Sequence, residues 1–335
     1  MGANVMNSKR FMAPEAPAKI DWLGKPEIDR VGWVKSCFIT HPNLVTIFND
    51  AAEKMEYCKS VGRFDAMLVI GGSGVGKTTL TLHLKSFAES VYGFVEPERT
   101  ICPVVQIQMP DPCTPVEISI AVLEALGDPL PRYGTRAEIF QRSKRMLRQC
   151  EVRLVLIDNF HDTPTKRGAQ GMKLAGARIR DLMDESNALW ILLGTKDAIR
   201  VRNSDPQLVK RVPYQQYLRY FSLKSRERIR EFKRLLEELE KWLPLAETSC
   251  LNEKNVVGRV FVATEGILDR LISLTARGCI EAIRARRETM LKQDLEKAFN
   301  HIFGEQDAVD NPFSEEFKMR QLKKPGEVYE VLGAA

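Results

Sequence analysis

The stretch Gly71-Gly72-Ser73-Gly74-Val75-Gly76-Lys77-Thr78-Thr79 decides the fold of this chain. It follows an apolar run of strand type, residues 66–70, and leads into residues 80–85, whose composition is that of a helix. A glycine loop of spacing G-x-x-x-x-G-K-[ST] between a strand and a helix is the P-loop pattern. We expect its backbone N–H groups to surround a nucleotide phosphate, Lys77 to reach the β- and γ-phosphates, and Thr78 to bind Mg²⁺. All the fixed positions match, which favours an ATP and Mg²⁺ site at residues 71–79 over a plain glycine turn.

Length and composition are those of a globular protein with more than one compact part. The chain has 335 residues, of which 44% are hydrophobic. Its seven cysteines are scattered and include no C-x-x-C pair, which favours reduced thiols over a zinc site or a disulfide framework. Residues 1–19 lack the apolar core of a signal peptide, and no apolar run approaches the roughly 20 residues of a membrane helix. We therefore predict a cytoplasmic protein with no membrane partner.

Positive charge is concentrated in two stretches, although the net charge of the chain is only +6. Residues 200–234 contain eleven Lys/Arg and three Asp/Glu, a local charge of +8, and residues 132–153 contain seven basic and two acidic residues. Such clusters fit a polyanion such as nucleic acid, and they also fit solvated helix faces. Charge alone leaves both interpretations open.

Further apolar runs have the composition of buried strands. Within residues 153–159, four apolar residues are followed by Asp158, the Walker B pattern, in which a carboxylate at the end of a parallel strand adjacent to the P-loop strand supports Mg²⁺. Residues 188–195 end in Thr195, whose hydroxyl is placed to contact the γ-phosphate or the attacking water. With strands at 103–108 and 216–222, the alternation of strands and helices predicts an α/β fold. In it, a parallel sheet carries helices on both faces and binds ligands at the carboxyl ends of its strands.

Capping patterns predict where several helices begin. Thr114-Pro115-Val116-Glu117 predicts a helix that runs to Leu126 and stops at Gly127, and Thr135-Arg136-Ala137-Glu138 predicts a basic helix to about Cys150. The segment from Trp22 into a helical pattern that opens at Pro42 is expected to pack beside the P-loop domain. It would either cover the nucleotide base or serve as a plain core helix.

We expect four parts along the chain. Residues 1–20 form a flexible N-terminal tail, and residues 21–224 form a P-loop α/β domain with an N-terminal extension. Residues 225–304 form an all-helical subdomain, with helices at 226–242, 256–263, 266–284 and 289–302. Residues 305–335 are expected to be a flexible, partner-binding tail.

Together these features resemble an AAA+ ATPase, in which a P-loop parallel sheet flanked by helices is followed by a small all-helical lid. More narrowly, residues 22–302 resemble the TniB/TnsC family of ATP-dependent transposition regulators. The stretches that carry this resemblance are Val104-Val105-Gln106-Ile107-Gln108-Met109-Pro110, Ala125-Leu126-Gly127, Leu156-Ile157-Asp158-Asn159-Phe160-His161, Leu193-Gly194-Thr195, Asp205-Pro206-Gln207-Leu208, Leu243-Pro244-Leu245 and Glu265-Gly266-Ile267-Leu268.

The resemblance implies a set of partners. Protomers would assemble on double-stranded DNA as a ring or helical filament when ATP is bound, and would recruit a transposase. A target-selection protein of the TniQ kind would position them, and the sequence leaves open whether a CRISPR effector takes part.

The resemblance also implies roles for single residues. Asp158 would support the metal and Thr195 would take the sensor position. Arg211 is the candidate arginine finger that reaches the γ-phosphate of the neighbouring protomer, with Lys210 as the alternative and a plain surface arginine as the simpler interpretation. Arg270 is the candidate sensor arginine of the lid, with an ordinary helix-surface role as its alternative.

One departure from the family concerns hydrolysis. The family's Walker B strand normally ends in Asp-Glu, whose glutamate acts as base, and Asn159 holds that place here. An amide orients water and cannot accept its proton. We therefore expect tight ATP binding and slow hydrolysis, unless Asp162 or His161 substitutes.

Loops after the second strand and after Walker B are the expected DNA contacts. Thr114, Lys166, Arg167 and Lys173 would bind phosphates without regard to sequence and with strong salt dependence. Two other functions remain open. One is a nucleotide-gated DNA scaffold that never hydrolyses ATP, and the other is an AAA+ replication or loader helper of the IstB or DnaA-like kind.

Overall fold

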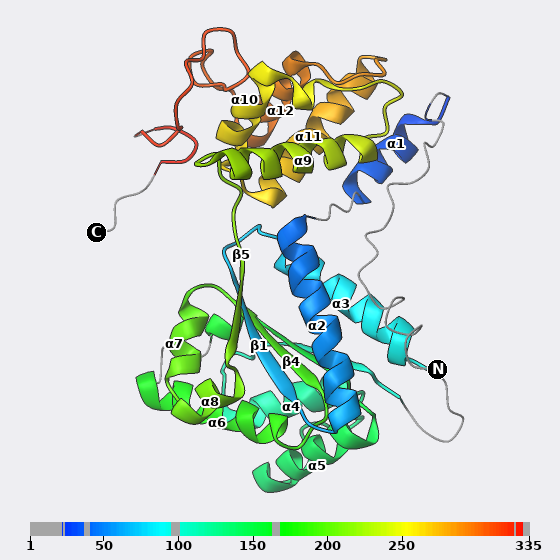
Figure 1. Cartoon of the computed structure of the whole chain (residues 1–335), viewed down its shortest axis with the longest axis vertical. Helices are drawn as coiled ribbons and strands as arrows, with labels where there is room; N and C mark the ends of the chain where they lie inside the picture. The colour runs from blue at the N-terminus through cyan, green and yellow to red at the C-terminus, as the bar shows by residue number, and fades with distance from the viewer. Residues whose placement is uncertain are drawn as a thin grey trace. The chain divides into compact units, whose positions relative to one another are not determined.

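The computed structural model describes residues 22, 24–36, 41–94, 101–162, 168–324 and 326–330. Within them the chain forms two compact units (Figure 1). The sheet unit is residues 43–219, and the helical unit combines the described residues of 22–42 with those of 220–330. The expected N-terminal tail, residues 1–20, lies outside the described residues.

The sheet unit contains five parallel strands. They are β1 (Asp65–Gly71), β2 (Val104–Gln108), β3 (Leu154–Asp158), β4 (Leu189–Gly194) and β5 (Tyr214–Leu218). Their order across the sheet is β2-β3-β4-β1-β5. The expectation that the Asp158 strand lies next to the P-loop strand is wrong, because β4 pairs with both β1 and β3 and separates them.

Successive residues of the central strands face two different cores. Leu68 and Trp190 pack on one face, whereas Met67 and Ile191 pack on the other. The central strands β1, β3 and β4 are buried on both sides, so their sequences are continuously apolar instead of alternating. This double burial is why the strands are visible in the sequence as short apolar runs.

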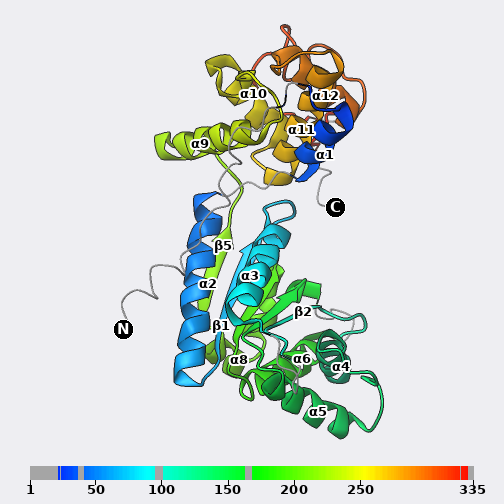
Figure 2. The same ribbon diagram turned by 90° about the vertical axis from the view of Figure 1, so that its right-hand side faces the viewer.

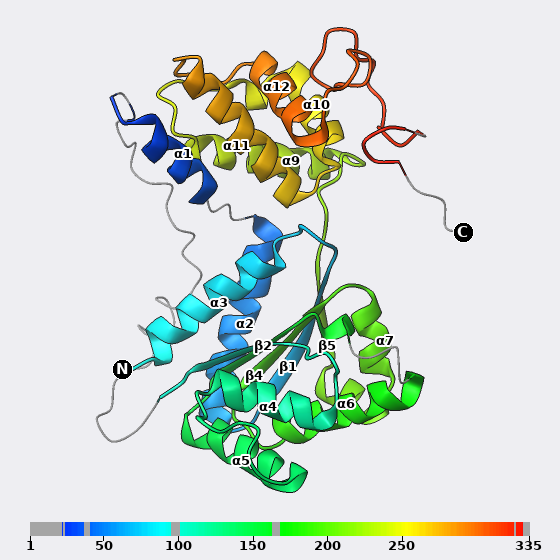
Figure 3. The ribbon, with the colours of Figure 1, turned by 180° about the vertical axis from the view of Figure 1, so that it is seen from behind.

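Helices cover both faces of this sheet. Those of the sheet unit are α2 (Pro42–Val61), α3 (Lys77–Tyr92), α4 (Pro115–Ala125), α5 (Arg136–Gln149), α6 (Gly168–Met183), α7 (Asp197–Asn203) and α8 (Pro206–Arg211). Residues of α2 and α3 share one core, and residues of α4 to α8 share the other. Figures 2 and 3 show α2 and α3 lying alongside each other, away from α4 and α6.

Both predicted helix caps are present. The Thr114 Oγ1 accepts a hydrogen bond from the Glu117 N–H (3.3 Å), and α4 is followed by Gly127 with φ 78°. Thr135 and Glu138 form a reciprocal capping box at the start of α5. The two helix starts predicted from the sequence are therefore confirmed.

The helical unit is built from α1 (Glu27–Ser36), α9 (Arg226–Trp242), α10 (Lys254–Thr264), α11 (Leu268–Arg284) and α12 (Lys292–Phe303). The apolar face of α9 supplies Phe232, Leu235, Leu236 and Leu239 to its core. Within this unit, the rings of His41 and Phe221 meet edge to face with centroids 5.5 Å apart. None of the described helices is long and apolar enough to cross a membrane.

The segment before α2 belongs with the helices and not with the sheet. Arg30, 7% exposed, donates through Nε and Nη2 to the Pro244 carbonyl (3.0 and 2.7 Å) and through Nη1 and Nη2 to the Glu288 carboxylate (both 2.9 Å). Trp33 stacks on Trp242 and donates from Nε1 to its carbonyl (2.9 Å). The expectation that this whole segment packs beside the P-loop domain therefore holds for α2 and not for α1, which contacts α11.

Residues 305–330, expected to be flexible, pack on the helical unit where they are described. Phe313 and Leu322 are buried in its core, and the Tyr329 hydroxyl donates to the Ala263 carbonyl. Arg259 donates to the carbonyls of residues 312 and 314, which ties the segment to α10. The apolar residues that are buried here are far apart in the sequence and separated by charged residues. They form no periodic pattern, so the sequence of this segment resembles that of a flexible tail.

Candidate nucleotide-binding site

The P-loop connects the end of β1 to the start of α3. Gly74 and Gly76 have φ values of 72° and 96°, a left-handed conformation that favours glycine. A Cβ on Gly71 would lie 2.6 Å from Val75 Cγ2 and 3.1 Å from Leu218 Cβ, so a side chain does not fit there. The first N–H groups of α3 have no acceptor within the helix and are free to bind an anion. The loop therefore has the backbone geometry of a phosphate cradle.

Lys77 is the first residue of α3 and turns back over this loop. Its Nζ donates to the carbonyls of Gly71 (2.9 Å) and Gly72 (2.8 Å). Burial lowers the pKa of Lys77, and the negative charge of Asp158 acts in the opposite direction. A half-buried ammonium in this position is complementary to an anion in the loop.

Asp158 ends β3 and is followed by a tight turn. Its Oδ1 accepts a hydrogen bond from the Asn159 N–H (2.8 Å), and Asn159 is left-handed with φ 53°. The Asp162 N–H donates to the Asn159 carbonyl (2.7 Å), closing the short 3₁₀ helix η2 (Phe160–Asp162). Because β1, β4 and β3 are parallel neighbours, Gly71, Thr195 and Asp158 follow their strands at the same edge of the sheet.

Thr195 lies directly after β4, between the other two. Its N–H donates to His161 Nδ1 (3.3 Å), and its Oγ1 is buried with no hydrogen-bond partner among the described residues. A Cβ on Gly194 would lie 2.8 Å from Ala198 Cβ and 3.1 Å from His161 Nδ1. The sequence does not predict the contact between His161 and Thr195, because the two residues are 34 positions apart and no motif pairs them.

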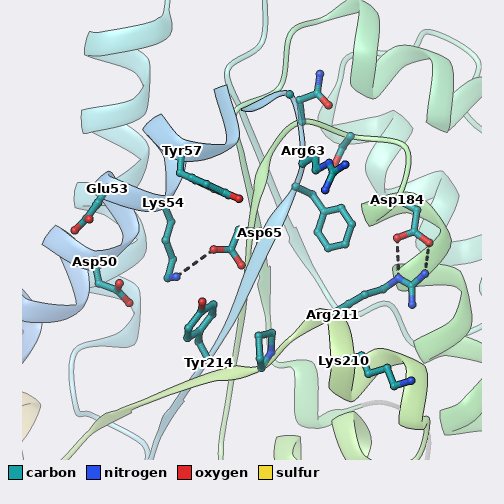
Figure 4. A pocket seen from close by; sticks show the side chains of 15 residues that line it. Asp50, Glu53, Lys54, Tyr57, Arg63, Asp65, Asp184, Lys210, Arg211 and Tyr214 are labelled. Carbon is teal, nitrogen blue, oxygen red and sulfur yellow. Dashed lines mark hydrogen bonds and ion pairs between the residues drawn. The ribbon is translucent and has the colours of Figure 1, made fainter. Parts of the chain in front are cut away.

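Arg211 lies at the end of α8 and is not near this edge. It pairs with Asp184 through two hydrogen bonds, Nε to Oδ1 and Nη2 to Oδ2, both 2.7 Å (Figure 4). These bonds raise the pKa of Arg211. Asp184 was not singled out in the sequence, where it lies 27 residues from Arg211 and outside any motif.

Arg211 and Asp184 line a cleft of about 930 Å³ together with Arg63, Lys210 and the first residues of β1 and β5, Asp65 and Tyr214. The cleft is thus at the amino ends of the strands. Gly71 is at the other end of β1, roughly 20 Å away at 3.3 Å per residue. One chain therefore does not bring Arg211 to its own P-loop.

The remaining predicted residues are dispersed. Arg270, in the first turn of α11, donates to Glu265 Oε2 (2.6 Å) and lies 4.3 Å from the Tyr329 ring centroid, with all three residues in the helical unit. The Thr114 hydroxyl is used as the α4 cap, and Lys173 is exposed on α6. Lys166 and Arg167 lie outside the described residues.

The chain was also compared with known proteins. A family model described as bacterial TniB protein matches residues 30–220. No curated protein sequence matches the chain.

Several solved structures are similar in fold. The Aeropyrum pernix ORC1 protein in complex with DNA has a TM-score of 0.59 and 16% identity, with 79% of this chain and 67% of that chain covered. Pyrobaculum aerophilum Cdc6p has a TM-score of 0.59 and 16% identity, with 83% and 72% covered. Drosophila ORC bound to DNA has a TM-score of 0.55 and 12% identity, with 90% and 74% covered. At these identities the likeness shows the AAA+ fold alone, and it confirms the predicted fold class.

Proposed function

Because this chain belongs to the TniB family, we propose that it is an ATP-dependent regulator of DNA transposition. In this proposal it assembles on double-stranded target DNA with ATP and Mg²⁺ and links a target-selection protein to a transposase. The observation that carries the proposal is the P-loop cradle, with Lys77 inside it, in a chain that matches this family.

The residues at the cradle fit a nucleotide with Mg²⁺. The Thr195 hydroxyl is buried and lacks a partner among the described residues, which suits a phosphate oxygen or a water at the site. No group of three or more His, Cys, Asp or Glu in the described part of the chain could hold a metal alone. Mg²⁺ keeps several waters and uses few protein ligands, so Thr78 and Asp158 suffice to hold it beside phosphates. When bound, Mg²⁺ supplies neutralisation of the phosphate charge.

Arg211 is proposed to act on the nucleotide of a neighbouring protomer. It lies at the opposite edge of the sheet from its own P-loop, and its planar guanidinium suits a phosphate. Within one chain Asp184 neutralises it, so contact with a neighbour requires Arg211 to exchange Asp184 for the γ-phosphate. Such a contact in trans would couple the nucleotide state to assembly.

Asn159 favours a second candidate function, a scaffold that binds ATP and does not hydrolyse it. The residue after Asp158 would ordinarily be the base, and its amide has no proton-accepting capacity at neutral pH. In this version the bound state alone controls assembly on DNA.

DNA is proposed to contact the exposed Lys173 and the loop that ends at Thr114, together with Lys166 and Arg167. Two of the similar structures, those of Aeropyrum pernix and Drosophila, contain DNA. Contacts of this kind are made to phosphates, so affinity should fall steeply as salt rises.

The proposal is tested by imaging the protein with duplex DNA and ATP, ADP or a non-hydrolysable ATP analogue. We expect DNA-dependent assemblies with ATP and the analogue and none with ADP or in Lys77→Ala. Arg211→Ala should raise the protein concentration needed for assembly roughly tenfold or more. The exposed Arg200→Ala serves as control, and Lys210→Ala tests the alternative finger. Identical oligomers with every nucleotide, indifferent to DNA, would contradict the proposal.

A further inference from the structure

We propose that His161 is a positioning residue that ties the turn after Asp158 to Thr195, so that the two sides of the nucleotide site move as one piece. The inference rests on the proposed function, because it assigns His161 a part in distinguishing ATP from ADP. In this inference His161 is not the base that replaces the Walker B glutamate.

Three hydrogen bonds and one longer contact around His161 connect Asp158 with Thr195. The Asp158 carboxylate accepts from the Asn159 N–H, and the Asn159 carbonyl accepts from the Asp162 N–H. The Asp162 carboxylate is 3.5 Å from His161 Nε2, and His161 Nδ1 accepts from the Thr195 N–H. The path therefore begins at the proposed metal ligand and ends at the proposed sensor, crossing from β3 to β4.

The end of β4 is shaped for this contact. Gly194 precedes Thr195, and a Cβ there would lie within 3.1 Å of His161 Nδ1 and 3.3 Å of its backbone nitrogen. Such distances are shorter than ordinary van der Waals contact, so any larger residue would push the η2 turn away from the strand. Gly194 thus allows the imidazole to reach the main chain of its neighbour.

The geometry fixes which nitrogen of His161 carries the proton. A backbone N–H can only donate, so His161 Nδ1 must offer its lone pair to Thr195. Neutral His161 then carries its proton on Nε2, on the side of Asp162. With one nitrogen occupied as acceptor and the other protonated, the ring has no free lone pair with which to take a proton from water. Its role is to hold the two turns together.

The contact also leaves the Thr195 side chain free for the nucleotide. The N–H is satisfied by His161, whereas the buried Oγ1 has no partner in the described part of the chain. A γ-phosphate oxygen, or a water bound to it, is chemically suited to that hydroxyl. If the nucleotide displaces Thr195, His161 would move with it and shift the turn that contains Asn159 and Asp158. Asn159 holds the position of the usual Walker B glutamate, so the nucleotide would act on the turn at that position.

Two substitutions separate this role from a general effect on the fold. The side-chain oxygen in His161→Asn replaces the Nδ1 acceptor, whereas the amide in His161→Gln lies near the position of Nε2 and cannot reach the Thr195 N–H. His301→Asn, at an exposed position of α12, is the matched control. Dissociation constants are measured for a non-hydrolysable ATP analogue and for ADP, with the melting temperature of each nucleotide-free protein.

Wild type, His161→Asn and His301→Asn are expected to prefer the analogue over ADP by the same ratio. His161→Gln should reduce that ratio about tenfold, with ADP affinity retained. The variant loses the hydrogen bond from the Thr195 N–H, and Thr195 is proposed to contact only the γ-phosphate, which ADP lacks. Equal ratios in His161→Asn and His161→Gln would overturn the inference. A merely structural role would lower the melting temperature and weaken both nucleotides alike.

If His161→Gln fails to fold, the wild-type protein itself provides the test. ¹⁵N-histidine NMR is expected to show His161 protonated on Nε2 when neutral, and protonation on Nδ1 would overturn the inference. Failure of the proposed function is recognised separately, as a wild-type protein with no preference between the analogue and ADP. If Thr195→Ala removes the preference and His161→Gln does not, the inference about His161 alone is wrong.

Discussion

Asn159 combines an unusual side chain with an unusual backbone. It follows the half-buried Asp158, where a base is expected, and its left-handed φ of 53° is tolerated by Asn and Asp better than by most other residues. Aspartate takes this backbone conformation more readily than glutamate does, although Glu151 and Glu265 have similar φ values of 52° and 51° in this chain. Aspartate is therefore the substitution that restores a carboxylate with the least effect on the turn.

Asn159→Asp is expected to raise ATP hydrolysis, because it adds a proton acceptor at a site that otherwise only orients water. A positioned base contributes roughly 100-fold or more, and a shorter side chain should provide at least about tenfold. Phosphate release is measured with and without DNA. Lys77→Ala gives the background rate without ATP binding, and Asn159→Ala is the control that changes the side chain without adding a carboxylate. If Asn159→Asp is no faster than wild type, lack of a base is not what limits the reaction.

His41 makes the helical unit sensitive to acid. Burial lowers its pKa to about 4, from an ordinary value of 6.5, and the ring is 3% exposed. Between these two pH values the unfolded chain binds a proton that the folded chain does not, so stability is full above pH 6.5 and falls as pH drops toward 4. The loss is on the order of 3 kcal/mol at most.

Urea unfolding between pH 7 and 4 measures this effect by comparison with His41→Phe, which preserves an aromatic ring against Phe221. The variant should lose less stability than wild type over that range, because the carboxylates titrate in both proteins and cancel. An equal loss in the two proteins would show that His41 does not contribute.

At the scale of elements, two helices begin with a threonine N-cap, and only one of these threonines lies in a loop that is expected to contact DNA. Thr114 caps α4, in the loop expected to contact DNA, and Thr135 caps α5 with a full capping box. Both hydroxyls accept from an N–H three residues later at 3.3 Å, so their structural roles are closely matched. The pair therefore allows a DNA contact to be separated from a cap.

Thr114→Ala and Thr135→Ala should each cost about 1 kcal/mol of unfolding free energy, because each leaves a helix N–H without its acceptor. Only Thr114→Ala should also weaken duplex DNA binding, measured by fluorescence anisotropy across a salt series. Equal DNA affinities in the two variants would remove Thr114 from the DNA contacts.

Local signals predicted single elements better than they predicted neighbours. Thr114, Thr135 and Gly127 marked helix ends correctly, because a cap depends only on residues within a few positions. The apolar runs of β1, β3 and β4 were recognised for the same reason, and Gly71, Asp158 and Thr195 were correctly expected at one edge. The insertion of β4 between β1 and β3 was missed, since strand order depends on long-range packing that periodicity does not contain.

Long-range side-chain partners were likewise beyond the sequence. Asp184, which binds Arg211, and His161, which binds Thr195, are 27 and 34 residues from their partners and belong to no motif that implies the pairing. Likewise, the sequence around Trp33 and Arg30 does not indicate that α1 packs on α11 and the Pro244 carbonyl instead of on the sheet. These contacts follow from the shape of the assembled units.

At the scale of the whole molecule, α1 connects the beginning of the described chain to the helical unit. The pairing of Arg30 with Glu288 and the Pro244 carbonyl is nearly buried, whereas Glu27 and Arg284 join α1 to α11 by an exposed pair at 3.5 Å. Both pairs attach α1 to the helical unit, and they differ in desolvation.

Arg30→Ala should lower the stability of the helical unit by about 2–3 kcal/mol, because a buried carbonyl and carboxylate lose their donor. Arg284→Ala should cost less than about 1 kcal/mol. Urea unfolding is followed by tryptophan fluorescence in a Trp190→Phe background, which leaves only Trp22, Trp33 and Trp242 of the helical unit. Similar losses in the two variants would show that α1 is only loosely attached.

The edge-to-face contact between His41 and Phe221 has a consequence for how the chain is made. The 177 residues from 43 to 219 are inserted in the sequence of the helical unit, and His41 and Phe221, which flank the insertion, are in contact. During synthesis the inserted unit is complete before residue 220 emerges, whereas α1 must wait for Glu288, which lies 258 residues after Arg30. Once the insertion has folded with its ends together, the loop that α1 must close is effectively short, so its entropic cost is small. Folding of the sheet unit thus makes it easier for α1 to pack on the rest of the helical unit.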